Sequence, residues 1–132
     1  MNYLLDTHSF IWSITDTNKL SHTAIREITN TDNQIFVSAI SFWEIALKSA
    51  LGKLTINGLS IKDLPNYAEQ MGFSLLSLTP AISASYAQLE ATYHKDPFDR
   101  MLIWQAINLD YSLITCDTTI NKYKSEGLAI CW

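Results

Sequence analysis

The chain has 132 residues, of which 48% are apolar and 17% carry a charged side chain. This length and apolar content suit one packed domain and exclude wholesale disorder. The net charge is −4, which argues against a general nucleic-acid binder with a basic face. It leaves room for an enzyme that gathers carboxylates around a metal ion.

The start of the chain and its cysteines indicate a protein of the cytoplasm. The N-terminus lacks a basic leader and reaches Asp6 at once, which argues against a signal peptide. No apolar run approaches the roughly 18 residues that a membrane-spanning helix needs, so we expect no membrane association. Cys116 and Cys131 lack the spacing of a metal site and are too few for a disulfide framework, so we expect them to be reduced.

The N-terminal half is predicted to alternate short strands with helices. In chain order it contains a strand over 3–5, a helix over 8–14, a helix from Ser21 to about residue 29, a strand over 34–37 and a helix from Ser38 to Gly52. The last of these helices carries apolar side chains at every third or fourth position, namely Ile40, Trp43, Leu47 and Leu51. Glu44 leans toward this apolar face, where an unpaired acid is costly.

The C-terminal half continues the alternation. It contains a segment over 60–70 that Pro65 interrupts, a strand over 73–78, a helix from Pro80 to about residue 93, a helix from Pro97, a strand over 112–115, a short helix over 119–125 and a strand over 128–130. The pattern predicts an α/β fold, a three-layer α/β/α sandwich around a central, mostly parallel five-stranded sheet. We expect residues 1–132 to form a single domain.

Acidic side chains follow two of the predicted inner strands. Asp6 comes directly after the first strand, and Asp117 follows the fourth. Sites in open parallel sheets form outside the carboxyl ends of the strands, so these two acids share an edge. In the helix that begins near Pro97, Asp96 suits the N-cap and Asp99 lies in the first turn.

Each of these acids alone has a structural explanation. An Asp after a strand often caps the next helix, and Glu44 can pair with Lys48 one turn on. Taken together they are harder to explain, because unit charges about 4 Å apart repel by about 4 kcal/mol at an effective dielectric of about 20. Oxygen-only ligands suit Mg²⁺ or Mn²⁺. The sequence therefore predicts a metal site that hydrolyses phosphodiesters.

Five blocks of sequence also stand in the order that they have in a known family. They are Tyr3-Leu4-Leu5-Asp6-Thr7-His8, Ser41-Phe42-Trp43-Glu44-Ile45, Gly52-Lys53-Leu54, His94-Lys95-Asp96-Pro97-Phe98-Asp99-Arg100 and Leu113-Ile114-Thr115-Cys116-Asp117. By these blocks the chain resembles PIN-domain ribonucleases of the VapC toxin type, and the resemblance spans nearly the whole chain, from Tyr3 to Tyr123.

The resemblance implies that four acids, Asp6, Glu44, Asp99 and Asp117, bind Mg²⁺ or Mn²⁺ as a quartet. It implies that Thr7 and Thr115 hold carboxylates or water by hydrogen bonds. It also implies cleavage of RNA within the strand, a small antitoxin that covers the active site, and a homodimer. Asp96 replaces Asp99 as the ligand if the helix begins later than we place it.

Arg100 and Lys48 are possible contacts to the substrate or to a partner. His94 shows no base partner in the sequence and is interpreted as a polar loop residue. Three tryptophans, Trp12, Trp43 and Trp104, are interpreted as core or dimer contacts rather than platforms for bases.

The main alternative is a catalytically silent module of the same fold that binds RNA or a partner protein. Acids at all four positions count against it, because binding RNA does not require carboxylates.

Overall fold

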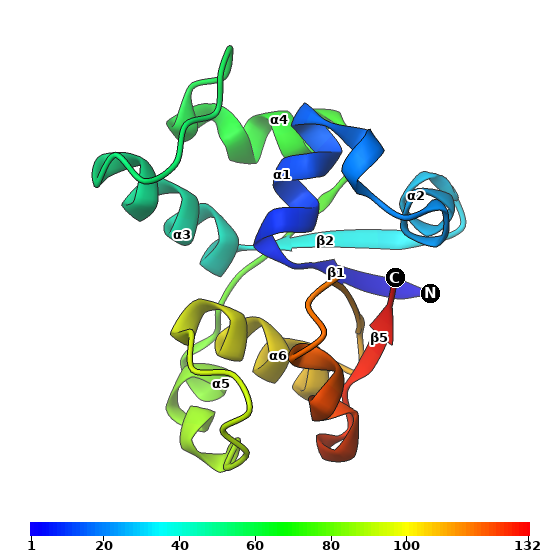
Figure 1. Ribbon diagram of the computed structural model, residues 1–132, viewed down its shortest axis with the longest axis vertical. Helices are drawn as coiled ribbons and strands as arrows, with labels where there is room; N and C mark the ends of the chain where they lie inside the picture. Colours follow the sequence, from blue (N-terminus) through cyan, green and yellow to red (C-terminus); the bar gives the residue numbers. More distant parts are fainter.

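The computed structural model describes all 132 residues and contains one parallel sheet of five strands in the order β3-β2-β1-β4-β5 (Figure 1). The strands are β1 (Asn2–Leu5), β2 (Gln34–Ser38), β3 (Ser74–Leu76), β4 (Ser112–Ile114) and β5 (Ala129–Cys131). The central strand β1 pairs in parallel with β2 on one side and with β4 on the other. The direction in which the sheet grows therefore reverses between β1 and β4.

Helices cover both faces of the sheet, which confirms the predicted three-layer fold. They are α1 (Thr7–Thr15), α2 (His22–Thr29), α3 (Ala39–Ala50), α4 (Leu64–Gln70), α5 (Pro80–Ala84) and α6 (Pro97–Leu109). Short 3₁₀ turns lie at Thr17–Lys19, Ile61–Asp63, Tyr86–Gln88 and Ile120–Glu126. Figure 1 shows α1, α2 and α4 on one side of the sheet and α5 and α6 on the other. None of the helices has the length and apolar character needed to cross a membrane.

The two faces of the sheet bury separate apolar clusters. Leu5 of β1 and Ile114 of β4 point into the cluster beneath α1, α2 and α4. Their chain neighbours Leu4 and Leu113 point into the opposite cluster, beneath α6. Because successive side chains of a strand alternate between faces, strands buried on both sides are apolar without interruption.

Side-chain caps confirm where three of the predicted helices begin. The Ser21 hydroxyl accepts a hydrogen bond from the Ala24 amide at 3.0 Å, and the Ser38 hydroxyl accepts one from Ile40 at 3.0 Å. Asp96 accepts from the Phe98 amide at 2.8 Å, as expected of an N-cap. The predicted starts of α2, α3 and α6 are therefore correct to within a residue.

The prediction of a long helix from Pro80 is wrong. Regular structure ends at Ala84 and resumes only as the 3₁₀ turn Tyr86–Gln88, after which residues 89–96 form a loop. In that loop the carbonyls of Leu89 and Ala91 accept hydrogen bonds from the Arg100 guanidinium at 2.7 and 2.6 Å. A side chain of α6 thus satisfies carbonyls that a helix would have paired with its own amides.

Two further expectations need correction. Pro65 lies in the first turn of α4, where its missing N–H costs nothing, so it begins the helix rather than interrupting it. On α3 the buried residues are Ile40, Ser41, Glu44 and Ile45. Trp43 and Leu51 of the predicted inward stripe are instead 60% exposed. The buried face of α3 is rotated from the apolar stripe because it packs against α1 and α6.

Candidate active site

Three of the four predicted acids meet at the carboxyl ends of the two innermost strands. Asp6 directly follows β1, Asp117 lies three residues beyond the end of β4, and Asp99 comes from the first turn of α6. They line a hollow of about 300 Å³, here called the acidic hollow, together with His8, Trp12 and Cys116. This is the point where the strand order reverses, the usual place for a site in an open parallel sheet.

Asp6 is a buried carboxylate held by the scaffold. It is 5% exposed, and its Oδ1 accepts a hydrogen bond from the Ser9 amide at 2.7 Å, which caps α1. The Thr115 hydroxyl also hydrogen-bonds to its side chain. Burial raises the pKa of Asp6 even though hydrogen bonds from Thr115 and Ser9 favour the ionised form. Its charge is therefore costly in this environment until a positive group approaches.

Thr115 links this carboxylate to the backbone at Asp117. Besides its bond to Asp6, its Oγ1 accepts a hydrogen bond from the Asp117 amide at 3.1 Å. Asp117 in turn accepts from the Thr119 amide at 2.8 Å through its Oδ1. Thr115 thus lies between Asp6 and the segment that carries Asp117, and the carboxylate-holding role expected of it stays a prediction.

Glu44 lies beside the acidic hollow and does not line it. It is 3% exposed, its Oε1 accepts a hydrogen bond from the Thr7 hydroxyl at 2.6 Å, and its Oε2 forms an ion pair with Lys48. The hydrogen bond that the Lys48 ammonium donates to Glu44 raises the pKa of Lys48. Both oxygens of Glu44 are thus engaged, and the pairing with Lys48 considered from the sequence is present. Convergence on one hollow holds for three acids and not for the full quartet.

Asp99 also lies in an environment that disfavours its ionised form. Burial, followed by the negative charge of Asp96, raises the pKa of Asp99 to about 7, and the charges of Glu44 and Asp6 act in the same direction. Asp96 itself is occupied as the N-cap of α6. These positions favour Asp99, rather than Asp96, as the group that serves the hollow.

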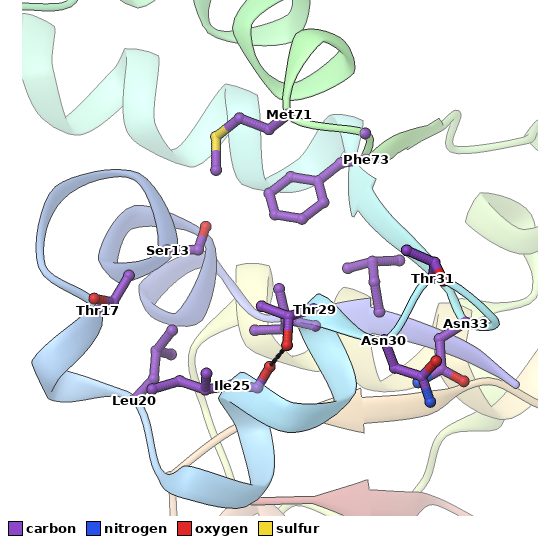
Figure 2. Close-up of a pocket in the computed structure, with 13 residues that line it drawn as sticks. Ser13, Thr17, Leu20, Ile25, Thr29, Asn30, Thr31, Asn33, Met71 and Phe73 are labelled. Carbon is purple, nitrogen blue, oxygen red and sulfur yellow. Dashed lines mark hydrogen bonds between the residues drawn. The ribbon is translucent and has the colours of Figure 1, made fainter.

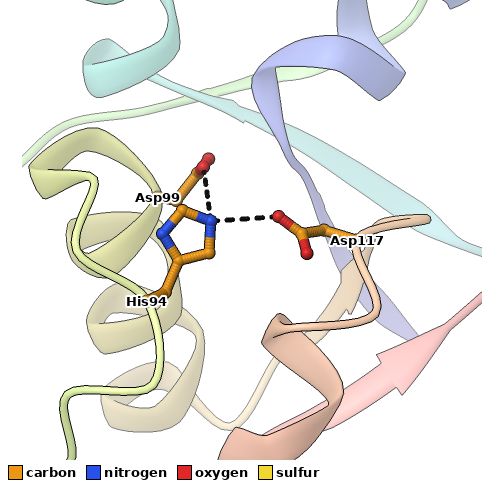
Figure 3. Close-up of side chains that lie close together, drawn as sticks. All are labelled: His94, Asp99 and Asp117. Atoms are coloured by element: carbon orange, nitrogen blue, oxygen red, sulfur yellow. Dashed lines mark hydrogen bonds and ion pairs between the residues drawn. The ribbon is translucent and has the colours of Figure 1, made fainter.

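His94 bridges two of the carboxylates, a contact that sequence reasoning missed. Its Nε2 lies 3.2 Å from Asp99 Oδ2 and 3.0 Å from Asp117 Oδ2 (Figure 3). Its Nδ1 accepts a hydrogen bond from the Asp96 amide at 3.2 Å. Since Nδ1 accepts, we assign the proton of the neutral ring to Nε2, which donates to both carboxylates. His94 is therefore a loop residue, as interpreted, but it has carboxylate partners that the sequence does not reveal.

Arg100 explains why His94 reaches this position. Its side chain is buried, and its guanidinium donates to Leu89 O, Ala91 O and the hydroxyls of Tyr86 and Tyr123. These bonds fix the loop 89–96 that carries His94. We therefore correct the expectation that Arg100 contacts the substrate or a partner. Its guanidinium donors already bind the loop and the two tyrosines.

The donor groups fit a divalent cation. Ligand atoms of Asp99 and Asp117 lie within 4.8 Å of one another and of a ring nitrogen of His94. The raised pKa values of Asp6 and Asp99 indicate that the hollow favours added positive charge, from protons or from a cation. Carboxylate oxygens are the ligands that Mg²⁺ and Mn²⁺ prefer.

A second hollow, of about 570 Å³, lies at the amino ends of β2 and β3 (Figure 2). Its polar groups are threonine, serine and asparagine, as in Ser13, Thr29 and Asn33, and no charged residue lines it. It therefore lacks the groups that acid–base or metal chemistry requires.

Comparison with known proteins agrees with this geometry. The family model described as PIN domain matches residues 3–126. Ribonuclease VapC22 of Mycobacterium tuberculosis is 26% identical over 129 residues, covering 98% of this chain and 97% of that protein.

Two solved structures share the fold. VapBC-1 from nontypeable Haemophilus influenzae has a TM-score of 0.70 at 21% identity, covering 98% of this chain and 96% of the other. VapBC2 from Rickettsia felis, bound to a DNA fragment from its promoter, has a TM-score of 0.69 at 17% identity, covering 98% and 97%.

Proposed function

Because the chain belongs to the PIN domain family, we propose that it is a metal-dependent endoribonuclease and the toxin of a toxin–antitoxin pair. The observation that carries the proposal is the convergence of Asp6, Asp99 and Asp117 on one hollow at the switch point of the sheet. The similarity to a ribonuclease over nearly the whole chain supports RNA as the substrate.

Asp6, Asp99 and Asp117 would hold the metal ion, Mg²⁺ or Mn²⁺, with Glu44 as the fourth acid beside them. When bound, such an ion supplies Lewis-acid activation of a phosphate oxygen and of an attacking water. The proposal therefore assigns hydrolysis of an RNA phosphodiester bond to this hollow.

The protein's own groups orient the carboxylates for this task. Ser9 and Thr115 fix Asp6, and Thr7 and Lys48 fix Glu44. Lys48 also adds positive charge beside an otherwise acidic site, where it would favour an approaching phosphate. Orientation by such neighbours commonly changes metal affinity or activity by about 10- to 100-fold.

Apolar surface beside the site supports protein partners. Trp43, Leu47 and Leu51 are exposed along α3, next to an apolar hollow of about 280 Å³ that Phe98 and Met101 help to line. Exposed apolar patches of this kind commonly mark interaction sites. We propose that a second copy of the chain packs here to form a homodimer.

A cognate antitoxin would cover the acidic hollow, in keeping with the VapBC complexes of the structural relatives. The protein would act in the cytoplasm as a single domain.

The test is incubation of the purified protein, freed of any antitoxin, with a pool of bacterial RNAs. Reactions contain Mn²⁺, Mg²⁺ or EDTA, and Asp6→Asn is run in parallel with Asp16→Asn. Asp16 also caps a helical turn by accepting from a backbone amide, but it lies outside the acidic hollow.

Discrete cleavage that requires both the metal and Asp6 would support the proposal. A folded protein that neither cleaves RNA nor binds Mn²⁺ would instead indicate the silent binding module.

A further inference from the structure

Two aromatic rings, those of His8 and Trp12, lie one turn apart on α1, the helix that Asp6 caps. His8 is exposed and Trp12 is half-buried, and their ring centroids lie 5.7 Å apart with a 41° tilt between the planes. Residues spaced i and i+4 share a helix face, so both rings border the same surface. Both line the acidic hollow beside Asp6.

The same two rings also line a neighbouring hollow of about 520 Å³, here called the α1 hollow. Its remaining walls are the rest of α1, Lys19 and the segment Leu54–Asn57. The acidic hollow and the α1 hollow therefore adjoin at His8 and Trp12. An RNA strand with one phosphate bound among the acids of the acidic hollow would therefore place its next nucleotide beside these two rings.

Trp12 is a firm part of this wall. Its ring packs against the apolar cluster beneath α1 and lies 6.2 Å from the Trp132 ring, centroid to centroid. A ring that packing already holds loses little conformational freedom when a ligand stacks on it. By contrast, Trp104 is buried and its indole N–H donates to Ile82 O, so it is a core residue.

We propose that the α1 hollow is a nucleobase subsite, in which the base next to the cleaved phosphate stacks on His8 and Trp12. The inference rests on the proposed ribonuclease function and adds where the substrate lies. A base has an aromatic face and a polar edge, and the hollow offers aromatic rings together with the polar side chains of Thr55 and Asn57. Lys19 would meet the next phosphate.

The lining of the hollow favours a base over a protein helix. An amphipathic helix binds a groove with apolar walls, as the hollow beside Trp43 provides with its six hydrophobic residues of eight. The α1 hollow is hydrophobic at five of ten positions, and its polar residues include Thr15, Lys19, Thr55 and Asn57. It also continues into the proposed catalytic site, as a substrate subsite must.

The experiment measures cleavage of a short RNA with a single cut site, in Mn²⁺, beside the same RNA with an abasic nucleotide next to the cut. The variants are Trp12→Ala, Trp12→Phe and His8→Ala. His22→Ala serves as the control, since His22 is an exposed histidine on α2 and lines neither hollow. His8→Ala removes an exposed ring and so tests the subsite even if Trp12→Ala disturbs folding.

Stacking of one base is worth about 1–3 kcal/mol, which corresponds to about 5- to 150-fold in affinity. We expect Trp12→Ala to raise KM for the intact RNA within this range while kcat changes little, and Trp12→Phe to restore most of the loss. On the abasic RNA, wild type and Trp12→Ala should have the same KM.

Equal losses on both RNAs, or an unchanged KM for Trp12→Ala and His8→Ala alike, would overturn the subsite. If Trp12→Ala weakened binding of the antitoxin alone, the surface would belong to that protein partner and not to RNA. Wild-type protein that cleaves RNA separates failure of this inference from failure of the proposed function. Without any wild-type cleavage, both fall together.

Discussion

The candidate site has two sides that are held in different ways. On one side, Asp6 directly follows β1 and Glu44 lies on α3, and both are almost fully buried. Their oxygens accept hydrogen bonds from backbone or side-chain groups of α1. On the other side, Asp99 and Asp117 are partly exposed. Their link to one another is the single N–H of His94, a loop residue.

This difference separates carboxylates that the fold has already positioned from carboxylates that a ligand can rearrange. The Asp6 and Glu44 side is fixed when the sheet and its helices form. The Asp99 and Asp117 side depends on a loop, on a shared hydrogen bond and on the charges nearby. A cation in the acidic hollow would thus meet one rigid acid, Asp6, and two adjustable ones, with Glu44 beside them. Substitutions on the two sides should have different consequences.

The largest effect is expected from the rigid side, at Asp6. Asp6→Asn should lower the rate of RNA cleavage by more than about 100-fold, beyond the range typical of residues that only orient a ligand. The fold should survive, because Asn also accepts from the Ser9 amide as an N-cap. Cleavage rates in Mn²⁺ and the circular dichroism spectrum check both statements. Wild-type activity in Asp6→Asn would remove the acidic hollow from the mechanism.

The next effect concerns the support of Glu44. Thr7→Val removes a buried donor to Glu44 Oε1 and should cost about 1–3 kcal/mol of stability. It should also lower activity by about 10- to 100-fold. Urea denaturation and cleavage rates measure the two losses. Thr7→Ser keeps the hydroxyl and should retain most of both, and a Thr7→Val protein as active as wild type would show that Glu44 needs no such support.

The contrast between the sides also decides what the sequence could predict. Asp6 and Asp117 were predictable because strand ends in a parallel sheet share an edge, a consequence of topology. The Asp96 cap and the place of Asp99 followed from local helix chemistry. His94 was not predictable, since its position depends on Arg100 binding the carbonyls of an irregular loop, 9 and 11 residues before it in the chain. The spacing along α3 also predicted that Glu44 leans inward, and Glu44 is buried. The exposure of Trp43 follows instead from how α3 packs, which the spacing does not encode.

A smaller effect is expected at Asp99, in the pH dependence of stability. The pKa of Asp99 is about 7 in the folded protein, against 3.8 for an aspartate in the unfolded chain. Between these values the folded state keeps a proton that the unfolded state loses, so stability falls as pH rises and is lowest above the folded pKa.

Asp99→Asn should therefore flatten the melting temperature between about pH 4 and 7 in EDTA. It should raise that temperature at pH 8 by about 4 °C for each kcal/mol of repulsion removed. Thermal melts across this range measure the change. Asp96→Asn should keep the helix cap and most activity while lowering the pKa of Asp99, because one neighbouring charge is gone. An inactive Asp96→Asn beside an active Asp99→Asn would exchange the roles of the two residues.

The smallest effect is expected at His94, where the adjustable side can be probed without changing a carboxylate. His94→Ala removes the N–H that Asp99 and Asp117 share, so the melting temperature in EDTA should fall by a few degrees, about 1 kcal/mol for one partly exposed hydrogen bond. His94→Gln places an amide N–H near the same point and should recover most of the loss.

Mn²⁺ should raise the melting temperature of His94→Ala at least as much as that of wild type, because the cation then faces two carboxylates with no competing donor. The exposed His22→Ala serves as the control and should match wild type in both conditions. A smaller Mn²⁺ stabilisation of His94→Ala would instead make His94 a ligand of the ion. The His94 imidazole would then bind the metal ion itself, on the side of the site that we describe as adjustable.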